Sequence, residues 1–141
     1  MPNFMRTEKS TATLFAFGSL VIGLIALALP AGVVFGAPIR GYTLFVASFG
    51  SLAGPFRQWQ DCYIALSSLV NVALYLVLPF GVIRGVWLRP LVVVAWLGSA
   101  YVVSLPAVVS VATSMAYFAW LLAFMFAAYG FLGLARQQPA A

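Results

Sequence analysis

Five side chains between Arg57 and Tyr75 are the part of this sequence whose residue types and spacing could do chemistry. On a helix, where each residue turns by about 100°, Asp61, Ser68 and Tyr75 fall on one face, and Asn71 lies beside them. A polar face on an apolar helix is typical of interhelical hydrogen bonds or of the lining of a pathway. Arg57 precedes Asp61 by one helical turn, so the two could form an ion pair. We therefore treat these five residues as a possible ligand or partner face.

The residue types on which most enzymes depend are scarce. The chain of 141 residues has no histidine, one cysteine (Cys62) and two acids, Glu8 and Asp61. This composition excludes a disulfide within the chain, a thiolate zinc site, histidine ligation of haem and a pair of cooperating carboxylates. We expect no catalytic, cofactor-binding or metal-binding residues, and therefore no enzyme. The seven basic residues are scattered singly, so no nucleic-acid-binding surface is expected.

The elements that position these residues follow from the composition, which is 65% hydrophobic and 6% charged. A soluble domain could not cover its core with so little polar surface. A membrane crossing needs about 20 apolar residues, which predicts an all-α integral membrane protein, a bundle of four transmembrane helices at about 11–29, 61–83, 90–111 and 115–135. Residues 1–10 and 136–141 are expected to be tails. A cleaved signal peptide is an alternative for the first apolar run, but that run exceeds the usual length.

Residues 37–60 match neither a membrane helix nor a solvated loop. Their uncharged middle, residues 41–56, lies between Arg40 and Arg57 and is short for a crossing. We expect a short apolar interfacial or re-entrant segment that forms an outer cap, either contacting a partner or covering a cavity.

The basic residues predict the orientation of the chain. With four spans, one side carries Arg40 and Arg57, and the other carries the remaining five, Arg6, Lys9, Arg84, Arg89 and Arg136. The positive-inside rule then places both termini in the cytoplasm. The composition fits a multi-pass protein of the cell inner (plasma) membrane.

The fourth helix carries small residues at a spacing that allows close helix packing. Ala119, Ala123 and Ala127 follow one face at intervals of four. Small residues at this spacing let helix backbones approach where lipid supplies no hydrophobic drive. They predict packing inside the bundle or contact with another subunit.

No family motif is recognised in the chain. Its size and helix number resemble small bacterial inner-membrane proteins such as auxiliary transporter subunits, immunity proteins and small multidrug exporters, although the first helix lacks the membrane-embedded glutamate of the exporters. The absence of catalytic groups favours a non-catalytic accessory or structural subunit of an inner-membrane complex, in contact with membrane lipid and with other subunits or itself. The alternatives are a small self-associating transporter or channel that uses the polar face, and an enzyme acting on a lipid or quinone headgroup.

Overall fold

Four long apolar helices make up most of the structure. The computed structural model describes residues 2–34, 37–84, 87–109 and 114–137. Within them, the helical stretches long and apolar enough to cross a membrane are Ser10–Ala28, Trp59–Arg84, Leu88–Ala107 and Met115–Arg136. The predicted all-α bundle with four helices of membrane-spanning length is confirmed.

The helix bounds differ in places from those the sequence predicts. The long elements are α1 (Pro2–Ala28), α3 (Trp59–Val72), the π-helical turn η2 (Ala73–Val77), α4 (Leu78–Arg84), α5 (Leu88–Val109) and α6 (Met115–Arg136). Helix α1 begins at Pro2, so most of the expected tail 1–10 is helical. Helices α3 and α4 form one continuous rod through η2, whose wider turn the sequence did not predict. Helix α6 begins as expected, because Ser114 Oγ accepts a hydrogen bond from Tyr117 N at 3.2 Å.

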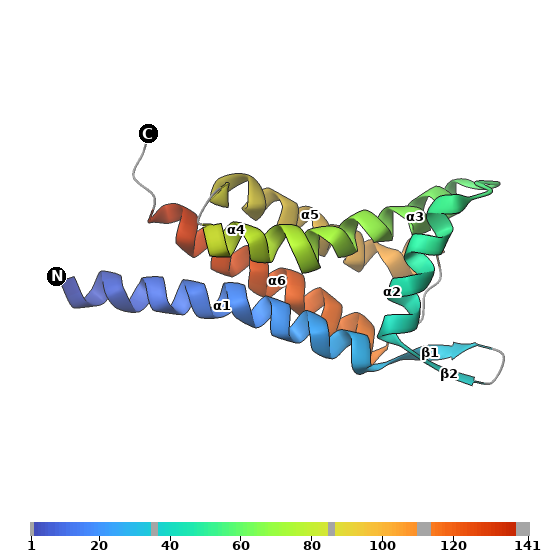
Figure 1. Ribbon diagram of the computed structural model, residues 1–141, viewed down its shortest axis with the longest axis horizontal. Helices are drawn as coiled ribbons and strands as arrows, with labels where there is room; N and C mark the ends of the chain where they lie inside the picture. Colours follow the sequence, from blue (N-terminus) through green and yellow to red (C-terminus); the bar gives the residue numbers. More distant parts are fainter. Residues whose placement is uncertain (1, 35–36, 85–86, 110–113, 138–141) are drawn as a thin grey trace.

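Helix α6 is the central helix of the bundle. It packs along α1 on one side and along α5 on the other, while the α3–α4 rod contacts α1 through η2 and α4 (Figure 1). The beginning of α1 and the end of α6 lie at the same end of the molecule. An even number of membrane-spanning helices produces this arrangement of the two chain ends.

Small residues allow α1 and α6 to approach closely. A Cβ atom added to Gly130 would lie 2.5 Å from Ala16 N and 2.9 Å from Ala12 O, both of them backbone atoms of α1. Ala123 and Ala127 are fully buried, whereas Ala119 is half-buried. Only glycine, which has no Cβ atom, lets the backbones of α1 and α6 approach this closely, so the α1–α6 interface depends on Gly130.

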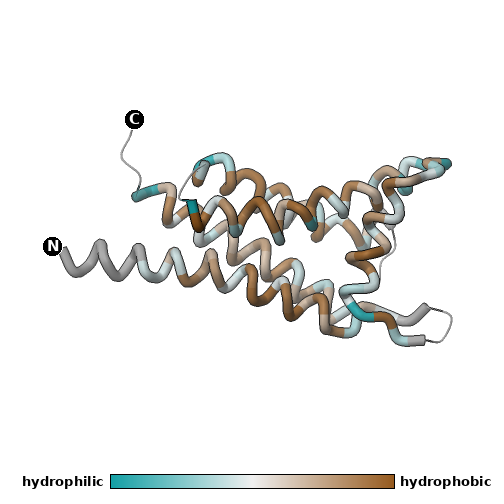
Figure 2. Tube along the Cα trace, in the orientation of Figure 1, coloured by the Kyte–Doolittle hydropathy of each residue, from teal (hydrophilic) through white to brown (hydrophobic). Residues whose placement is uncertain are grey.

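Aliphatic and aromatic side chains fill the middle of the bundle. The largest of those that are fully buried are Phe124 and Phe131 of α6, Val102 of α5, and Leu74 and Leu78 of the α3–α4 rod. They belong to one continuous cluster. Hydrophobic residues dominate the middle of the bundle, and hydrophilic residues gather toward its two ends (Figure 2).

The segment between α1 and α3 folds as a ribbon followed by a short helix. Strands β1 (Pro30–Val34) and β2 (Ala37–Arg40) pair antiparallel, with Pro30 opposite Arg40 and Val34 opposite Ala37. Helix α2 (Gly41–Gly50) and the 3₁₀ turn η1 (Ser51–Ala53) follow. The sequence predicted a short apolar segment here but no strands. Helix α2 runs across the end of the bundle opposite the beginning of α1 (Figure 1).

Candidate functional site

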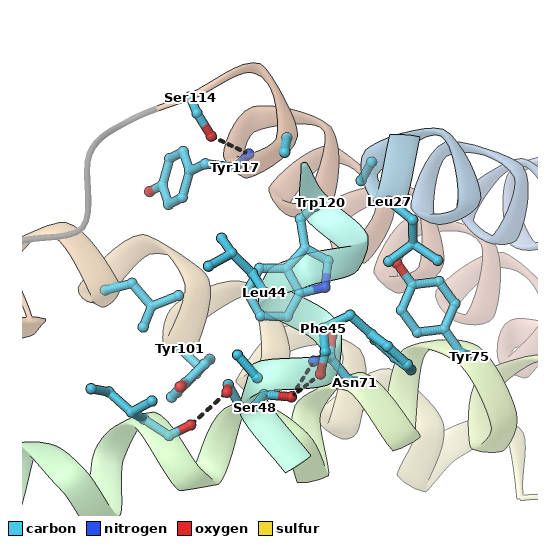
Figure 3. A pocket seen from close by; sticks show the side chains of 17 residues that line it. Leu27, Leu44, Phe45, Ser48, Asn71, Tyr75, Tyr101, Ser114, Tyr117 and Trp120 are labelled. Atoms are coloured by element: carbon cyan, nitrogen blue, oxygen red, sulfur yellow. Dashed lines mark hydrogen bonds between the residues drawn. The ribbon is translucent and has the colours of Figure 1, made fainter. Parts of the chain in front are cut away.

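A cavity of about 280 Å³ lies beneath α2, where the four long helices meet the crossing helix. Every long helix contributes to its wall. Its lining includes Leu27 of α1, Phe45 of α2, Asn71 of α3, Tyr101 of α5 and Trp120 of α6 (Figure 3). Binding sites for small molecules are commonly concave and mainly apolar, with a few placed polar groups, and this cavity has that composition.

Helix α2 forms the roof of the cavity because a glycine lets it touch α1. A Cβ atom on Gly41 would lie 2.0 Å from Ala26 O and 3.0 Å from Leu27 Cα. Further along α2, Phe45 packs edge-on against Tyr75, with ring centroids 5.5 Å apart. These contacts hold α2 against both α1 and the α3–α4 rod.

A buried hydrogen bond joins the roof to α3. Asn71 Nδ2 donates to Ser48 Oγ at 3.1 Å, and Ser48 Oγ in turn donates to Phe45 O at 2.7 Å. The single hydroxyl proton of Ser48 is therefore committed to its own helix, which leaves its oxygen to accept from Asn71. Both side chains are buried, so this pair satisfies polar groups that would otherwise be costly inside an apolar bundle.

Tyrosine hydroxyls tie the remaining walls together. Tyr75 donates to Gly23 O of α1 at 2.7 Å, and Tyr101 of α5 donates to Tyr63 O of α3 at 2.8 Å. The Tyr63 and Tyr101 rings stack with centroids 4.9 Å apart, and the Tyr63 hydroxyl also bonds the Ser104 hydroxyl. Tyr75 and Tyr101 thus line the cavity while their hydroxyls bond backbone carbonyls of other helices.

Trp120 differs from these groups. Its indole Nε1 is buried and has no hydrogen-bond partner among the residues that the structure describes. Its ring lies in the cavity wall beside Phe124, with centroids 6.3 Å apart. A buried donor without a partner costs about 1–3 kcal/mol. Trp120 is therefore the polar group that most needs an acceptor in this region.

Asp61 acts on the helix backbone instead of pairing with the Arg57 side chain. Its Oδ2 accepts from Arg57 N at 2.8 Å and from Gln58 N at 3.0 Å. The ion pair suggested by the sequence does not form. Helix α3 begins at Trp59, so Arg57 precedes the helix and Asp61 occupies its third position, where a carboxylate caps the free N–H groups.

The structure divides the polar face that the sequence indicated. Asn71 and Tyr75 line the cavity, together with Ser67. Ser68 is fully buried and donates to Ala65 O of its own helix at 2.6 Å, outside the cavity. Asp61 borders a separate hollow with Ser51, Gly54, Pro55 and Ile64, and the Arg57 side chain is exposed.

The chemistry available in the cavity is hydrogen bonding and apolar contact. Its described lining contains no acid, no base and no thiol, only apolar residues, serines, tyrosines, Asn71 and Trp120. Over the described part of the chain, no group of three or more His, Cys, Asp or Glu residues could hold a metal ion. Such a lining can bind a molecule but offers no group for proton transfer near neutral pH.

No protein-family model, curated protein or solved structure matches this chain. Function must therefore be argued from the cavity itself.

Sequence reasoning did not assign Ser48, Tyr101 or Trp120 to a site. Ser48 lies on a segment whose fold the sequence did not determine. Tyr101 and Trp120 lie on helices whose polar residues do not form a polar face. One signal was present, since a tryptophan deep within an apolar helix must place its N–H somewhere. The sequence alone does not show which helices surround it.

Proposed function

We propose that this protein is a non-catalytic inner-membrane protein that binds a lipid-soluble molecule beneath α2 and serves a larger membrane complex as an accessory subunit. The cavity is the observation that carries this proposal. It has a volume of about 280 Å³, at the lower limit for small-molecule sites, and its described lining is uncharged. A ligand reaching it from a bilayer would bring apolar surface and few charges, which this lining accommodates.

The accessory role is supported by the faces that the four long helices leave uncovered. In the most apolar 18 residues of each candidate span, only 28% to 39% are buried within the chain. The outer face of the α3–α4 rod exposes Leu66, Leu69, Leu76 and Ile83. These faces offer a surface to lipid and to another membrane subunit.

The proposed orientation places α2 at the outer membrane surface and both termini in the cytoplasm. Arg84 ends α4 and Arg136 ends α6 at the end of the bundle where α1 begins, whereas Arg40 and Arg57 precede α2 and α3 at the opposite end (Figure 1). The more basic end is the cytoplasmic one under the positive-inside rule.

A transporter or channel is less well supported. The polar side chains that would line a pathway already have partners within the protein. Ser68 and Tyr75 donate to backbone carbonyls, and Asn71 donates to Ser48. The fully buried side chains of Leu74 and Phe124 fill the bundle instead of leaving a polar path. This alternative predicts that Asn71→Leu and Asp61→Asn abolish flux in liposomes while the protein still assembles; the proposed function predicts no flux from the wild type.

Affinity purification in mild detergent followed by native mass spectrometry tests the proposal. We expect the protein to carry a bound lipid-soluble molecule and to copurify with a membrane complex whose yield falls when this protein is deleted. Recovery of the protein alone and empty, with every membrane complex intact in the deletion strain, would contradict it.

A further inference from the structure

The donor groups around the cavity are not equivalent. The hydroxyls of Ser48, Ser67, Tyr75 and Tyr101 each donate to a backbone carbonyl within the protein. The Trp120 indole N–H has no such partner among the described residues, and its nitrogen is buried. Because Trp120 also lines the cavity, its N–H is a donor at the cavity wall that can be satisfied without breaking an internal hydrogen bond.

The surroundings of Trp120 define the acceptor that it can take. The described lining carries no arginine or lysine that would neutralise a carboxylate or phosphate. An anion would thus lose its hydration without gaining a counter-charge, which is strongly unfavourable in an apolar site. An uncharged carbonyl oxygen meets both conditions, since it accepts a hydrogen bond and can be buried at low cost.

The shape of the wall is consistent with this group. Four aromatic residues line the same cavity (Figure 3). They are Phe45 of α2, Tyr75 of the α3–α4 rod, Tyr101 of α5 and Trp120 of α6. Figure 3 shows the Trp120 indole extending from α6 toward the side chains of α2 and α3. Aromatic walls bury large apolar surfaces, while the indole edge supplies the polar contact.

We propose that the Trp120 indole N–H donates a hydrogen bond to an uncharged carbonyl oxygen of the lipid-soluble molecule in the cavity. The inference rests on the proposed function, because it names the chemical group that the cavity recognises. Two membrane components carry this group, namely a quinone ring and the ester of a glycerolipid. Trp120 is in either case a specificity-determining residue, since it favours carbonyl-bearing lipids over those without a carbonyl.

Three lipid environments separate the two sources. The protein, labelled with ¹⁵N at its indoles, is placed in nanodiscs of diether phosphatidylcholine, which has no ester carbonyl. It is then examined in diester phosphatidylcholine, and in diether lipid to which a decyl benzoquinone is added. The indole resonance of Trp120 is assigned by its loss in Trp120→Phe. We expect a downfield shift of the N–H proton and slower exchange with solvent in the diester lipid or with the quinone, and the environment that gives the shift identifies the source.

Matched tryptophan replacements provide the second measurement. Trp120→Phe keeps an aromatic ring but removes the donor, and should weaken binding of the identified lipid or quinone by about tenfold. Trp96→Phe makes the same change at an exposed position on α5 and should leave binding unchanged. The same Trp120 resonance in all three environments, with a bound ligand visible by native mass spectrometry, would overturn the inference while leaving the proposed function in place. If native mass spectrometry shows no bound molecule in any of the three environments or in the protein as purified, the proposed function fails and the inference with it.

Discussion

Asn71 of α3 and Ser48 of α2 are joined by a buried hydrogen bond of 3.1 Å between residues that are 23 positions apart in the chain. This bond holds the crossing helix over the cavity. Its partners are polar groups within an apolar bundle, where a donor without an acceptor is costly. The stability of the roof should therefore depend on both side chains together.

Ser48→Ala should lower the free energy of unfolding by about 1 kcal/mol, because it leaves the Asn71 amide without an acceptor in a site of low polarity. Denaturant titration in mild detergent measures the change. Asn71→Leu provides the test of coupling, since Ser48→Ala should cost much less in that background. Equal costs of Ser48→Ala in both backgrounds would show that the bond does not contribute to stability.

Gly130→Ala should weaken the bundle at the α1–α6 interface. The added Cβ would lie 2.5 Å from Ala16 N, and a backbone atom cannot move aside without displacing α1. We expect a loss of about 1–3 kcal/mol in the free energy of unfolding. Gly50→Ala is the matched control, because a Cβ there has no neighbour within 4 Å. A Gly130→Ala protein as stable as the Gly50→Ala protein would mean that the helices pack differently.

Gly41→Ala should loosen the roof of the cavity more than it loosens the bundle. Its Cβ would lie 2.0 Å from Ala26 O, so the start of α2 must move away from α1. We expect hydrogen–deuterium exchange to increase in α2 while the core of α6 keeps its protection. Increased exchange confined to α6, with α2 unchanged, would contradict the proposed role of Gly41.

Asp61 should stabilise α3 through its backbone contacts and not through the Arg57 guanidinium. Asp61→Ala removes the acceptor of Arg57 N and Gln58 N and should cost about 1 kcal/mol, with faster amide exchange at the start of α3. Arg57→Gln keeps both backbone donors and should have little effect. An equal loss in the two variants would restore the ion-pair interpretation.

The sequence predicted the four long helices because their apolar runs end at residues that stop a membrane helix. Pro30 follows α1, Arg84 ends the α3–α4 rod, and Ser114 caps α6. The strands β1 and β2 were missed because each forms only by pairing with the other, and neither strand has the alternating pattern of a half-buried sheet.

The cavity could be predicted only in part, for physical reasons that differ from residue to residue. Helical periodicity placed Asn71 and Tyr75 on the same helix face, and both line the cavity. It could not show that α3 begins at Trp59, which turns Asp61 into a capping residue, nor that Ser48 would come from a helix crossing the bundle. The neighbours of Trp120 come from elements far apart in the sequence, so no local pattern records them.

The central claim is that the cavity beneath α2 holds a lipid-soluble molecule, and a cavity-filling variant tests it most directly. Ala116 is buried and lines the cavity, so Ala116→Leu fills part of its volume, whereas Ala100→Leu adds the same side chain at an exposed position outside it. Native mass spectrometry of the folded proteins from mild detergent should show the bound molecule on the wild type and on Ala100→Leu, and its loss from Ala116→Leu. The same bound mass at the same occupancy on all three proteins, or none on the wild type, would contradict the claim.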